Sequence, residues 1–389
     1  MSLHGQSSLG CLKRPNKLPL LRRFYSCCRT VKEYDVLFLR QHGPKHAKWH
    51  LTAPLRSGAR VRLSYGASVP ASDLIGRRLL DIVRDSSNNS VVLHEPTLAS
   101  YIVNSERLAT PIYPHDATTI VSLLDINPSR PGEDDEDDHN APPFEIFEAG
   151  TGMGSLTMHI ARTIYAANPT FPLLSDICSP PHPTNPTTTS PPQEAALTSL
   201  QTSNHARAAY KLIRNFRRAQ YLSPIDFHVG SVEEYLGRRL EESGGKPFLS
   251  RVILDLPSAH DNAERVVQAL HPNGLLILFN PSISQIAEFQ TWSNETLQPI
   301  RLEKVIELHA TTVSDGGVHD SAGGRHWDVK TVVPKAEQGE DGNGKPVQVM
   351  RPKVGERVAG GGFVAVLRRW PDTLEQKQEI TEETESQEE

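Results

Sequence analysis

The residues best suited to chemistry lie in one short stretch, FEIFEAGTGMGSLTMHIA at 144–161. An apolar run ends there in the acid Glu148, and glycines then occupy alternate positions at Gly150, Gly152 and Gly154. Glycine has no Cβ, so it allows the backbone to turn sharply and a ligand to approach it closely. The stretch therefore predicts a strand followed by a tight loop that could hold a ligand.

A helix is expected directly after this loop. Leu156, Ile160 and Ile164 recur at four-residue spacing, as on the buried face of a helix. The free N–H groups at a helix N-terminus favour an anionic group of a ligand. Ser155 and Thr157 could cap the helix or contact such a group.

The spacing of the glycines narrows the choice of ligand. A dinucleotide-binding loop needs G-x-G-x-x-G, but the position of its last glycine is occupied by Ser155. The order acid-x-Gly-x-Gly-x-Gly instead resembles the first motif of Rossmann-like S-adenosylmethionine (SAM) methyltransferases. A tight turn without a ligand is the alternative.

Strand and helix patterns alternate through the rest of the chain. Strands are expected at 195–201, 225–231, 251–257, 275–280, 302–308 and 361–370, and helices at 204–220, 231–242, 261–270 and 282–292. Such alternation predicts an α/β fold with a mostly parallel sheet, which binds ligands at the carboxyl ends of its strands. The residues expected at that rim are Glu148, Gly150–Gly154, the 199–203 turn, Gly230, Ser231 and Asp255.

Before this domain, residues 31–98 show short apolar strands separated by Gly and Pro, which predicts a small N-terminal β domain. A main domain is expected over 99–370, where Asp116 could cap the helix that follows Pro114. Three segments near 127–143, 169–195 and 311–350 have the composition of unstructured insertions, and 371–389 is an acidic tail.

The first 30 residues contain no Asp or Glu, several Ser and six Lys or Arg residues, a composition typical of a mitochondrial transit peptide. Arg23-Phe24-Tyr25-Ser26 resembles a processing site for import into the matrix. The alternative is a basic arm that contacts RNA or directs import into the nucleus.

Composition and spacing count against several other classes of protein. No apolar run approaches the roughly 18 residues of a membrane span, and the net charge is −5, so any surface for nucleic acid must be local. The four cysteines form no C-x-x-C pair. His42, His46 and His50 have helical spacing, but Gly43-Pro44 interrupts any helix, so no metal site is expected. Basic residues on the helix near 204–220 indicate either a solvated face or a stripe that contacts phosphates.

Taken together, several stretches resemble the catalytic subunits of the tRNA (adenine-N1)-methyltransferases that modify the T-loop adenine at position 58. The stretches are 71–83, 96–126, 147–162, 251–289, 301–308 and 361–370, and the resemblance spans about 34–370. It implies a Rossmann-like SAM methyltransferase that acts on tRNA, as a homo-oligomer or together with a related non-catalytic subunit.

The resemblance also implies roles for individual residues. Those expected to bind SAM are Glu148, Gly150, Gly152, Gly154, Ser155, Leu156, Thr157, Gln201, Gly230, Ser231 and Asp255. Asp255 would also lie next to the target base, which must leave its stack to be methylated. Tyr113 would line the base pocket; the alternative for Tyr113 is an ordinary core aromatic.

Two departures from the family pattern stand out. The acid that such enzymes place at the end of the second strand, where it binds the ribose hydroxyls, corresponds here to Gln201. The Gly-His-Thr expected before the last strand reads Gly360-Gly361-Gly362. The missing acid keeps open a second reading, a non-catalytic methyltransferase-like subunit that binds tRNA or a partner.

Overall fold

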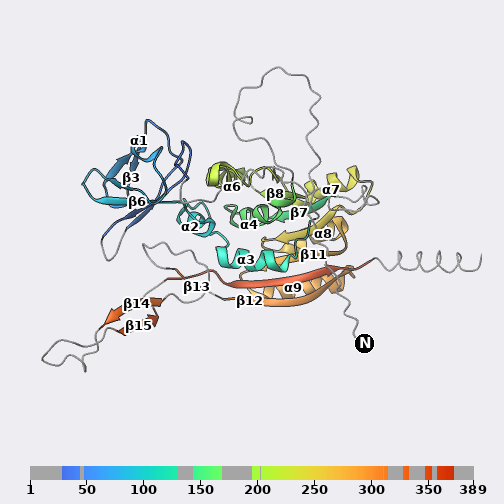
Figure 1. The fold of residues 1–389 in the computed structure, drawn as a ribbon. Coiled ribbons are helices and arrows are strands. Elements are labelled where there is room, and N and C mark those ends of the chain that lie inside the picture. Colours follow the sequence, from blue (N-terminus) through green and yellow to red (C-terminus); the bar gives the residue numbers. More distant parts are fainter. Residues whose placement is uncertain are drawn as a thin grey trace, which may run out of the picture.

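The structure, a computed structural model, describes residues 29–43, 48–128, 143–168, 195–201, 203–309, 311–313, 327–332, 347–352 and 357–371. The acidic loop before 143, the insertion at 169–194, residues 1–28 of the predicted transit peptide and nearly all of the acidic tail lie outside these residues. Figure 1 shows a small β domain beside a larger α/β body.

The N-terminal β domain contains an antiparallel sheet in the order β2-β1-β6-β5 and a separate β3-β4 pair. Its elements are β1 (Phe38–Gln41), β2 (Trp49–Leu51), β3 (Arg60–Arg62), β4 (Ser68–Pro70), α1 (Ala71–Leu74), β5 (Ile82–Arg84) and β6 (Ser90–His94). The first strand begins later than the apolar pattern at 34–40 suggests, because Tyr34 has a positive φ of 67° that interrupts an extended backbone. Leu37, Leu39, Val91 and Leu93 alternate inward and form a core with Leu74.

A seven-stranded sheet forms the centre of the main domain, in the order β12-β17-β11-β10-β7-β8-β9. Its strands are β7 (Phe144–Ala149), β8 (Ala195–Gln201), β9 (Ile225–Val229), β10 (Leu249–Leu254), β11 (Leu270–Asn280), β12 (Ile300–Leu308) and β17 (Gly362–Arg369). Every pairing from β11 to β9 is parallel, whereas β17 runs antiparallel to both β11 and β12. The Rossmann-like α/β fold predicted from the sequence is therefore confirmed.

Helices cover both faces of this sheet. One apolar cluster joins the sheet to α2 (Leu98–Asn104), α3 (Pro114–Leu123), α4 (Ser155–Ile164) and α6 (Ser203–Asn215), and another joins it to α7 (Val232–Glu242), α8 (Ala263–Ala269) and α9 (Ile283–Glu295). Short 3₁₀ helices lie at η1 (Tyr165–Ala167), η2 (Phe216–Arg218) and η3 (Ala259–Asn262). Neighbouring residues of β7 face opposite sides, since Ile146 belongs to the first cluster and Phe147 to the second. Burial on both faces explains why the central strands read as continuous apolar runs.

The predicted insertion near 311–350 needs correction. The structure places strands there and just beyond, namely β13 (Thr311–Val313), β14 (Trp327–Val332), β15 (Val347–Pro352) and β16 (Arg357–Ala359). β13 pairs with β16, and β14 pairs with β15, in antiparallel ladders. The β14-β15 ladder extends away from the body in Figure 1. Valines and threonines at alternate positions suit such a ladder, but the surrounding Gly, Asp and Lys masked the pattern in the sequence.

Strand β11 is also longer than predicted. The strand predicted at 275–280 begins at Leu270 in the structure and includes Pro272, Asn273 and Gly274, with Asn273 at a φ of 68°. The register against β10 is irregular at this level, between Leu249 and Arg251. Within the described residues, none of the helices combines the length and the apolar character needed to cross a membrane.

Candidate functional site

The carboxyl ends of β7 and β10 bring two acids to the same rim of the sheet. Glu148 is the penultimate residue of β7 and pairs in register with Ile253 of β10. Asp255 follows β10 directly, and its N–H donates to the Ala149 carbonyl at 2.9 Å. The strand order reverses between β7 and β10, and such switch points are where open α/β sheets bind ligands.

The glycine loop is fitted against this rim by Gly150. This residue has a φ of 96°, and a Cβ added to it would lie 2.0 Å from the Asp255 carbonyl oxygen. No side chain can be placed there without moving the end of β10. Gly150 therefore holds the loop and Asp255 in contact.

The other two glycines of the loop serve different purposes. Gly154, at a φ of 83°, packs against α6, where an added Cβ would lie 2.9 Å from the Ala209 Cβ. Gly152 has a φ of 55°, and the nearest atom to an added Cβ would be the Gly150 carbonyl oxygen at 3.9 Å. Gly152 thus faces open space, and this leaves room for a ligand beside the loop backbone.

Glu148 and Asp255 share an environment that disfavours negative charge. Glu148 is buried, and the Thr157 hydroxyl donates to its Oε2 at 2.6 Å. Burial is the main cause that raises the pKa of Glu148 to about 7, with a further contribution from the charge of Asp255. Burial also raises the pKa of Asp255 to about 7. Two partly protonated acids at one rim would be stabilised in their charged form by a cationic ligand.

The first turn of α4 differs from its predicted role in one respect. Its N-cap is Gly154 and has no side-chain capping bond, so neither Ser155 nor Thr157 caps the helix. The Ser155 hydroxyl instead donates to the Ile112 carbonyl at 2.5 Å, and Leu156 is buried in the core. What this turn can offer a ligand is therefore its backbone N–H groups. The sequence could not reveal that both hydroxyls are used within the protein.

Strands β8 and β9 extend the same rim. The Thr151 and Ser199 hydroxyls lie 2.5 Å apart and join the loop to β8. Gln201 is the last residue of β8, as predicted, and its side chain lies outside the described part of the structure. Gly230 and Ser231 follow β9 and are exposed, and Ser231 caps α7 by accepting from the Glu234 N–H at 3.1 Å. The binding roles assigned to these residues stay predictions.

Tyr113 lies next to the glycine loop because the Ile112 carbonyl before it accepts the Ser155 hydrogen bond. It is buried at the N-cap of α3, and Arg107 Nη1 donates to its hydroxyl oxygen at 3.3 Å. The structure thus places Tyr113 near the rim, although it lies far from both β8 and β10 in the chain. Its predicted part in the base pocket stays a prediction.

Asp116 has a different role from the predicted one. The N-cap of α3 is Tyr113, and Asp116 lies buried in the first turn. Its Oδ2 accepts from the Gly361 N–H at 3.2 Å, and an added Cβ on Gly360 would lie 2.6 Å from the same oxygen. Gly360 and Gly361, directly before β17, thus allow α3 to pack against the start of this strand, a function that the family pattern did not suggest.

The basic helix α6 presents most of its charge to solvent. Ala209, Leu212, Ile213 and Phe216 are buried, as predicted for the inner face. Lys211 forms an ion pair with Glu106 at 3.3 Å, and Arg217 lies 3.9 Å from Glu95. Arg207, Arg214 and Arg218 are exposed. Both alternatives for this helix, a solvated face or a phosphate-contacting stripe, are compatible with this arrangement.

In the described ranges, no three His, Cys, Asp or Glu side chains are grouped as metal ligands would be.

The chain is similar in sequence to known methyltransferases. No protein-family model matches the chain. Over 303 residues the chain is 26% identical to the tRNA (adenine(58)-N(1))-methyltransferase TrmI of two Thermus thermophilus strains, which covers 78% of this chain and 86% of the relative.

Two solved structures show a similar fold. A SAM-dependent O-methyltransferase from Thermotoga maritima matches with a TM-score of 0.57 and 14% identity, over 88% of this chain and 96% of that one. The tRNA (m1A58) methyltransferase TrmI from Aquifex aeolicus matches with a TM-score of 0.51 and 13% identity, over 88% of this chain and all of that one. Together these findings show the fold of a SAM-dependent methyltransferase and a chain that is similar, over most of its length, to the tRNA (adenine(58)-N(1))-methyltransferase TrmI.

Proposed function

We propose that this protein transfers a methyl group from SAM to N1 of adenine 58 in the T-loop of tRNA. The observation that carries the proposal is the contact between the glycine loop and Asp255, which joins a cofactor-type loop to an acid at the switch point of the sheet. The Thermus relatives, named for this activity, support the choice of substrate.

The residues at the rim suit this cofactor. Gly152 leaves open space beside the loop, and the start of α4 has no side-chain cap. Glu148 is buried and Asp255 is partly buried, and neither forms an ion pair within the described residues. SAM, when bound, supplies a methyl group activated by a positively charged sulfur. The backbone N–H groups of the first turn of α4 would hold its carboxylate, and Glu148 and Asp255 would favour its positive charge.

Asp255 is the residue of this protein that would contact the reacting base. Adenine N1 has a lone pair on a neutral ring, so the reaction needs alignment rather than a strong base. The Asp255 carboxylate can accept a hydrogen bond from the exocyclic amine of adenine and stabilise the positive charge that develops on the ring. In a folded tRNA the N1 edge is engaged in pairing, so the base must be turned out into a pocket, which Tyr113 would line.

The direct test is incubation of the purified protein alone with labelled SAM and unmodified tRNA transcript, followed by nucleoside analysis. We expect 1-methyladenosine in the wild-type transcript and none in a transcript that carries another base at position 58. Methylation of both transcripts would contradict the assigned position. If neither transcript is labelled, the protein alone is not active on tRNA.

The second candidate is a non-catalytic subunit, and the observation in its favour is Gln201 at the end of β8 in place of an acid. Calorimetric titration with SAM separates the two. The enzyme is expected to bind SAM with a stoichiometry near one per chain. A protein that binds tRNA but gives no heat with SAM would favour the second candidate.

We also propose that the protein acts as an oligomer in the mitochondrial matrix. The acid-free N-terminal segment supports import, with the nucleus as the alternative. In the described residues β12 pairs only with β17, so the outer edge of β12 is available to another chain. Light scattering of the purified protein would test the assembly, and a mass of one chain at micromolar concentration would contradict it.

A further inference from the structure

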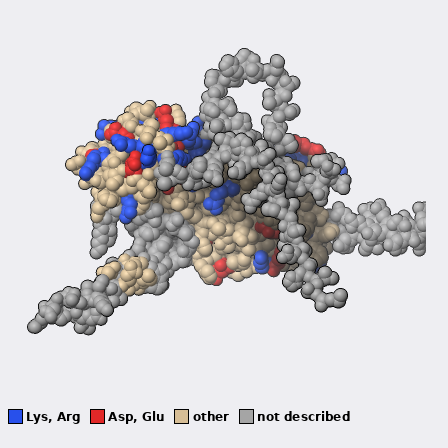
Figure 2. Space-filling model, viewed as in Figure 1, with Lys and Arg blue, Asp and Glu red and all other residues tan. Residues whose placement is uncertain are grey.

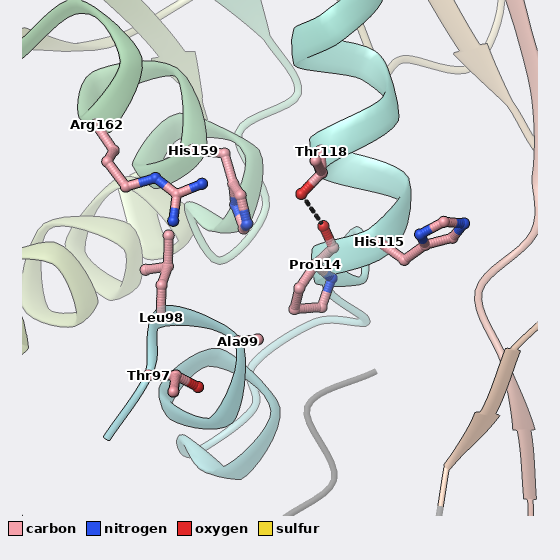
Figure 3. A pocket seen from close by; sticks show the side chains of 8 residues that line it. All are labelled: Thr97, Leu98, Ala99, Pro114, His115, Thr118, His159 and Arg162. Atoms are coloured by element: carbon pink, nitrogen blue, oxygen red, sulfur yellow. Dashed lines mark hydrogen bonds between the residues drawn. The ribbon is translucent and has the colours of Figure 1, made fainter. Parts of the chain in front are cut away.

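A second pocket lies beside the candidate active site, enclosed by α2, α3 and α4. Its volume is about 240 Å³, and its lining is Thr97, Leu98, Ala99, Pro114, His115, Thr118, His159 and Arg162. Figure 3 shows these side chains around the space between the starts of α2 and α3 and the middle of α4. Neither the glycine loop nor Asp255 contributes to it. The proposed reaction therefore leaves this pocket without a function.

His159 gives the pocket a hydrogen-bond acceptor. Only 3% of the residue is exposed, and its Nδ1 lies 2.8 Å from the Ser155 carbonyl oxygen. A carbonyl can only accept, so Nδ1 carries the proton and donates. Burial, and to a lesser extent the charge of Arg162, lower the pKa of His159 to about 4, so the ring is neutral at physiological pH. Nε2 is then an acceptor, and the described residues provide no donor for it.

Arg162 gives the same pocket a cation. It lies three residues after His159 on α4 and is exposed, and the described acids form no ion pair with it. In Figure 3 its guanidinium lies over Leu98, on the same side of α4 as the His159 ring. The start of α3, which has no side-chain cap, also faces this space through Pro114. A positively charged group and a helix N-terminus together favour an anion.

A ligand that matches both features must carry a hydroxyl donor and an anionic group a short distance apart. A ribose–phosphate unit has this pair, because its 2′-hydroxyl can donate to Nε2 while a phosphate accepts from the guanidinium. The cavity is smaller than the roughly 300 Å³ at which sites for free small ligands begin. One unit of a longer chain therefore fits it better than a free nucleotide does.

The location of the pocket agrees with this occupant. Pro114 follows Tyr113 directly, and His159 lies one helical turn after Ser155, which bonds to the Ile112 carbonyl. The pocket and the candidate active site thus share the starts of α3 and α4. An RNA whose base reaches Asp255 can therefore place a neighbouring backbone unit at this part of the surface.

We propose that the α2–α3–α4 pocket holds one ribose–phosphate unit of the substrate RNA beside the target base. His159 Nε2 accepts from its 2′-hydroxyl, and Arg162 pairs with its phosphate. The proposal rests on the proposed function, since it takes RNA as the substrate. It gives the enzyme a way to distinguish RNA from DNA at one defined nucleotide.

The test uses fluorescent T-arm hairpins that carry a single 2′-deoxy substitution at each position around the target adenine. Binding of the full-length protein is measured by anisotropy, and kcat and KM are measured separately. Arg162→Ala should weaken RNA binding and raise KM about tenfold, as expected for one charge-assisted hydrogen bond, with kcat and SAM affinity unchanged. The matched control is Arg238→Ala, an exposed arginine on α7 on the other side of the sheet, which should bind RNA as the wild type does.

The 2′-hydroxyl is tested with His159→Phe, which keeps a ring but removes the acceptor. One deoxy position should weaken binding to the wild type several-fold and have no further effect on this variant. Equal losses at that position in both proteins, or no sensitive position in the wild type, would overturn the proposal. If His159→Phe has a much lower melting temperature than the wild type, its binding data are set aside. The proposal then requires both that one deoxy position weakens RNA binding to the wild type and that Arg162→Ala weakens RNA binding. Anisotropy does not depend on turnover, so an inactive protein that still shows these losses would contradict the proposed function and not this pocket.

Discussion

Gly150 is the residue at which the site tolerates least change. Gly150→Ala would put a Cβ 2.0 Å from the Asp255 carbonyl oxygen and keep a φ of 96° that disfavours side chains. We expect a loss of stability of about 1–3 kcal/mol from overpacking, and loss of measurable SAM binding. Thermal melts and calorimetry check both results.

Gly152→Ala is the matched control for this change. Gly152 has the φ of a left-handed residue but open space around it, so only about 1–2 kcal/mol of conformational cost is expected. This variant should fold and yet bind SAM more weakly, because the new methyl group occupies the space left for the ligand. Wild-type affinity in Gly152→Ala would mean that the ligand does not pass this side of the loop.

Substitution of Asp255 should affect the rate of methyl transfer much more than the affinity for SAM. Asp255→Ala is expected to weaken SAM binding by no more than about tenfold, because Glu148 still supplies a negative charge nearby. It should lower kcat at least about 100-fold, because the hydrogen bond to the exocyclic amine matters most as charge develops on the base. Calorimetry and single-turnover methylation measure the two effects. Turnover at the wild-type rate in this variant would remove Asp255 from the mechanism.

The two acids at the rim predict a pH dependence of SAM binding. Glu148 and Asp255 have pKa values near 7 in the ligand-free protein, and a bound cation lowers both. SAM affinity should therefore rise with pH up to about 7 and level off above it, by up to tenfold per pH unit for each proton released. Titrations from pH 6 to 8.5 check this, with the demethylated product, which lacks the positive charge on sulfur, as a control that should depend less on pH. Equal slopes for both ligands would contradict the assignment.

The same shifts affect stability with the opposite sign. Both folded-state pKa values lie above the ordinary values of 4.5 and 3.8, so the folded protein binds protons more tightly than the unfolded chain does. The resulting stabilisation is fully present below about pH 4 and is lost as the pH rises through 7. The two acids thus make the ligand-free protein less stable at neutral pH than at acidic pH, and their negative charges at neutral pH favour a cationic ligand.

At the scale of elements, the contact between α3 and the start of β17 shapes the base side of the site. Asp116 and Gly361 are 245 residues apart in the chain, yet the carboxylate accepts the glycine N–H. Its other oxygen, Oδ1, is buried without a hydrogen-bond partner, and burial raises the pKa of Asp116. Asp116 therefore positions the helix that carries Tyr113 at some cost to stability.

This contact can be tested with two variants. Asp116→Ala should lose about 1–3 kcal/mol, because the Gly361 N–H is left without its acceptor. Asp116→Asn retains an acceptor and has no charge to bury, so it should equal or exceed the wild type in stability, with an advantage that grows from pH 5 to pH 8. Denaturant unfolding at the two pH values measures both. An advantage that shrinks with rising pH would show that the carboxylate is stabilised as an anion.

At the scale of the molecule, charge is distributed unevenly. The chain has a net charge of −5, but the described part of the N-terminal β domain carries more Lys and Arg than Asp and Glu. Figure 2 shows basic side chains gathered over this domain. Local positive charge is what an otherwise acidic protein needs to attract RNA, because phosphates dominate the affinity. The β domain is therefore well suited to contact tRNA away from the reacting base.

The N-terminal segment predicts where the protein acts. Residues 1–30 fused to a fluorescent protein should direct it to mitochondria, and the full chain without them should not enter. Microscopy with a matrix marker measures both. A matched control replaces the six basic residues of this segment by Gln, since import depends on positive charge. Nuclear fluorescence of the intact fusion would favour the alternative location.

Local patterns in the sequence determined the fold class and half of the site. Apolar runs and helical spacing predict the order of strands and helices, and the glycines reveal where the backbone adopts positive φ. The position of Asp255 directly after an apolar strand was enough to place it at the rim. These features depend on neighbours in the chain, so they can be read without the tertiary structure.

Only the tertiary structure decided how distant residues meet. In the fold, Thr157 hydrogen-bonds to Glu148, Ser155 to Ile112 and Asp116 to Gly361. The fold also forms the pocket that His159 and Arg162 line. It also pairs the short strands after residue 310 that looked like a loop. Glu148 and Thr157 are only nine residues apart but lie on different elements, and the other pairs join segments far apart in the chain. The free energy that selects such partners comes from packing and hydrogen bonding across the whole fold, which no local pattern records.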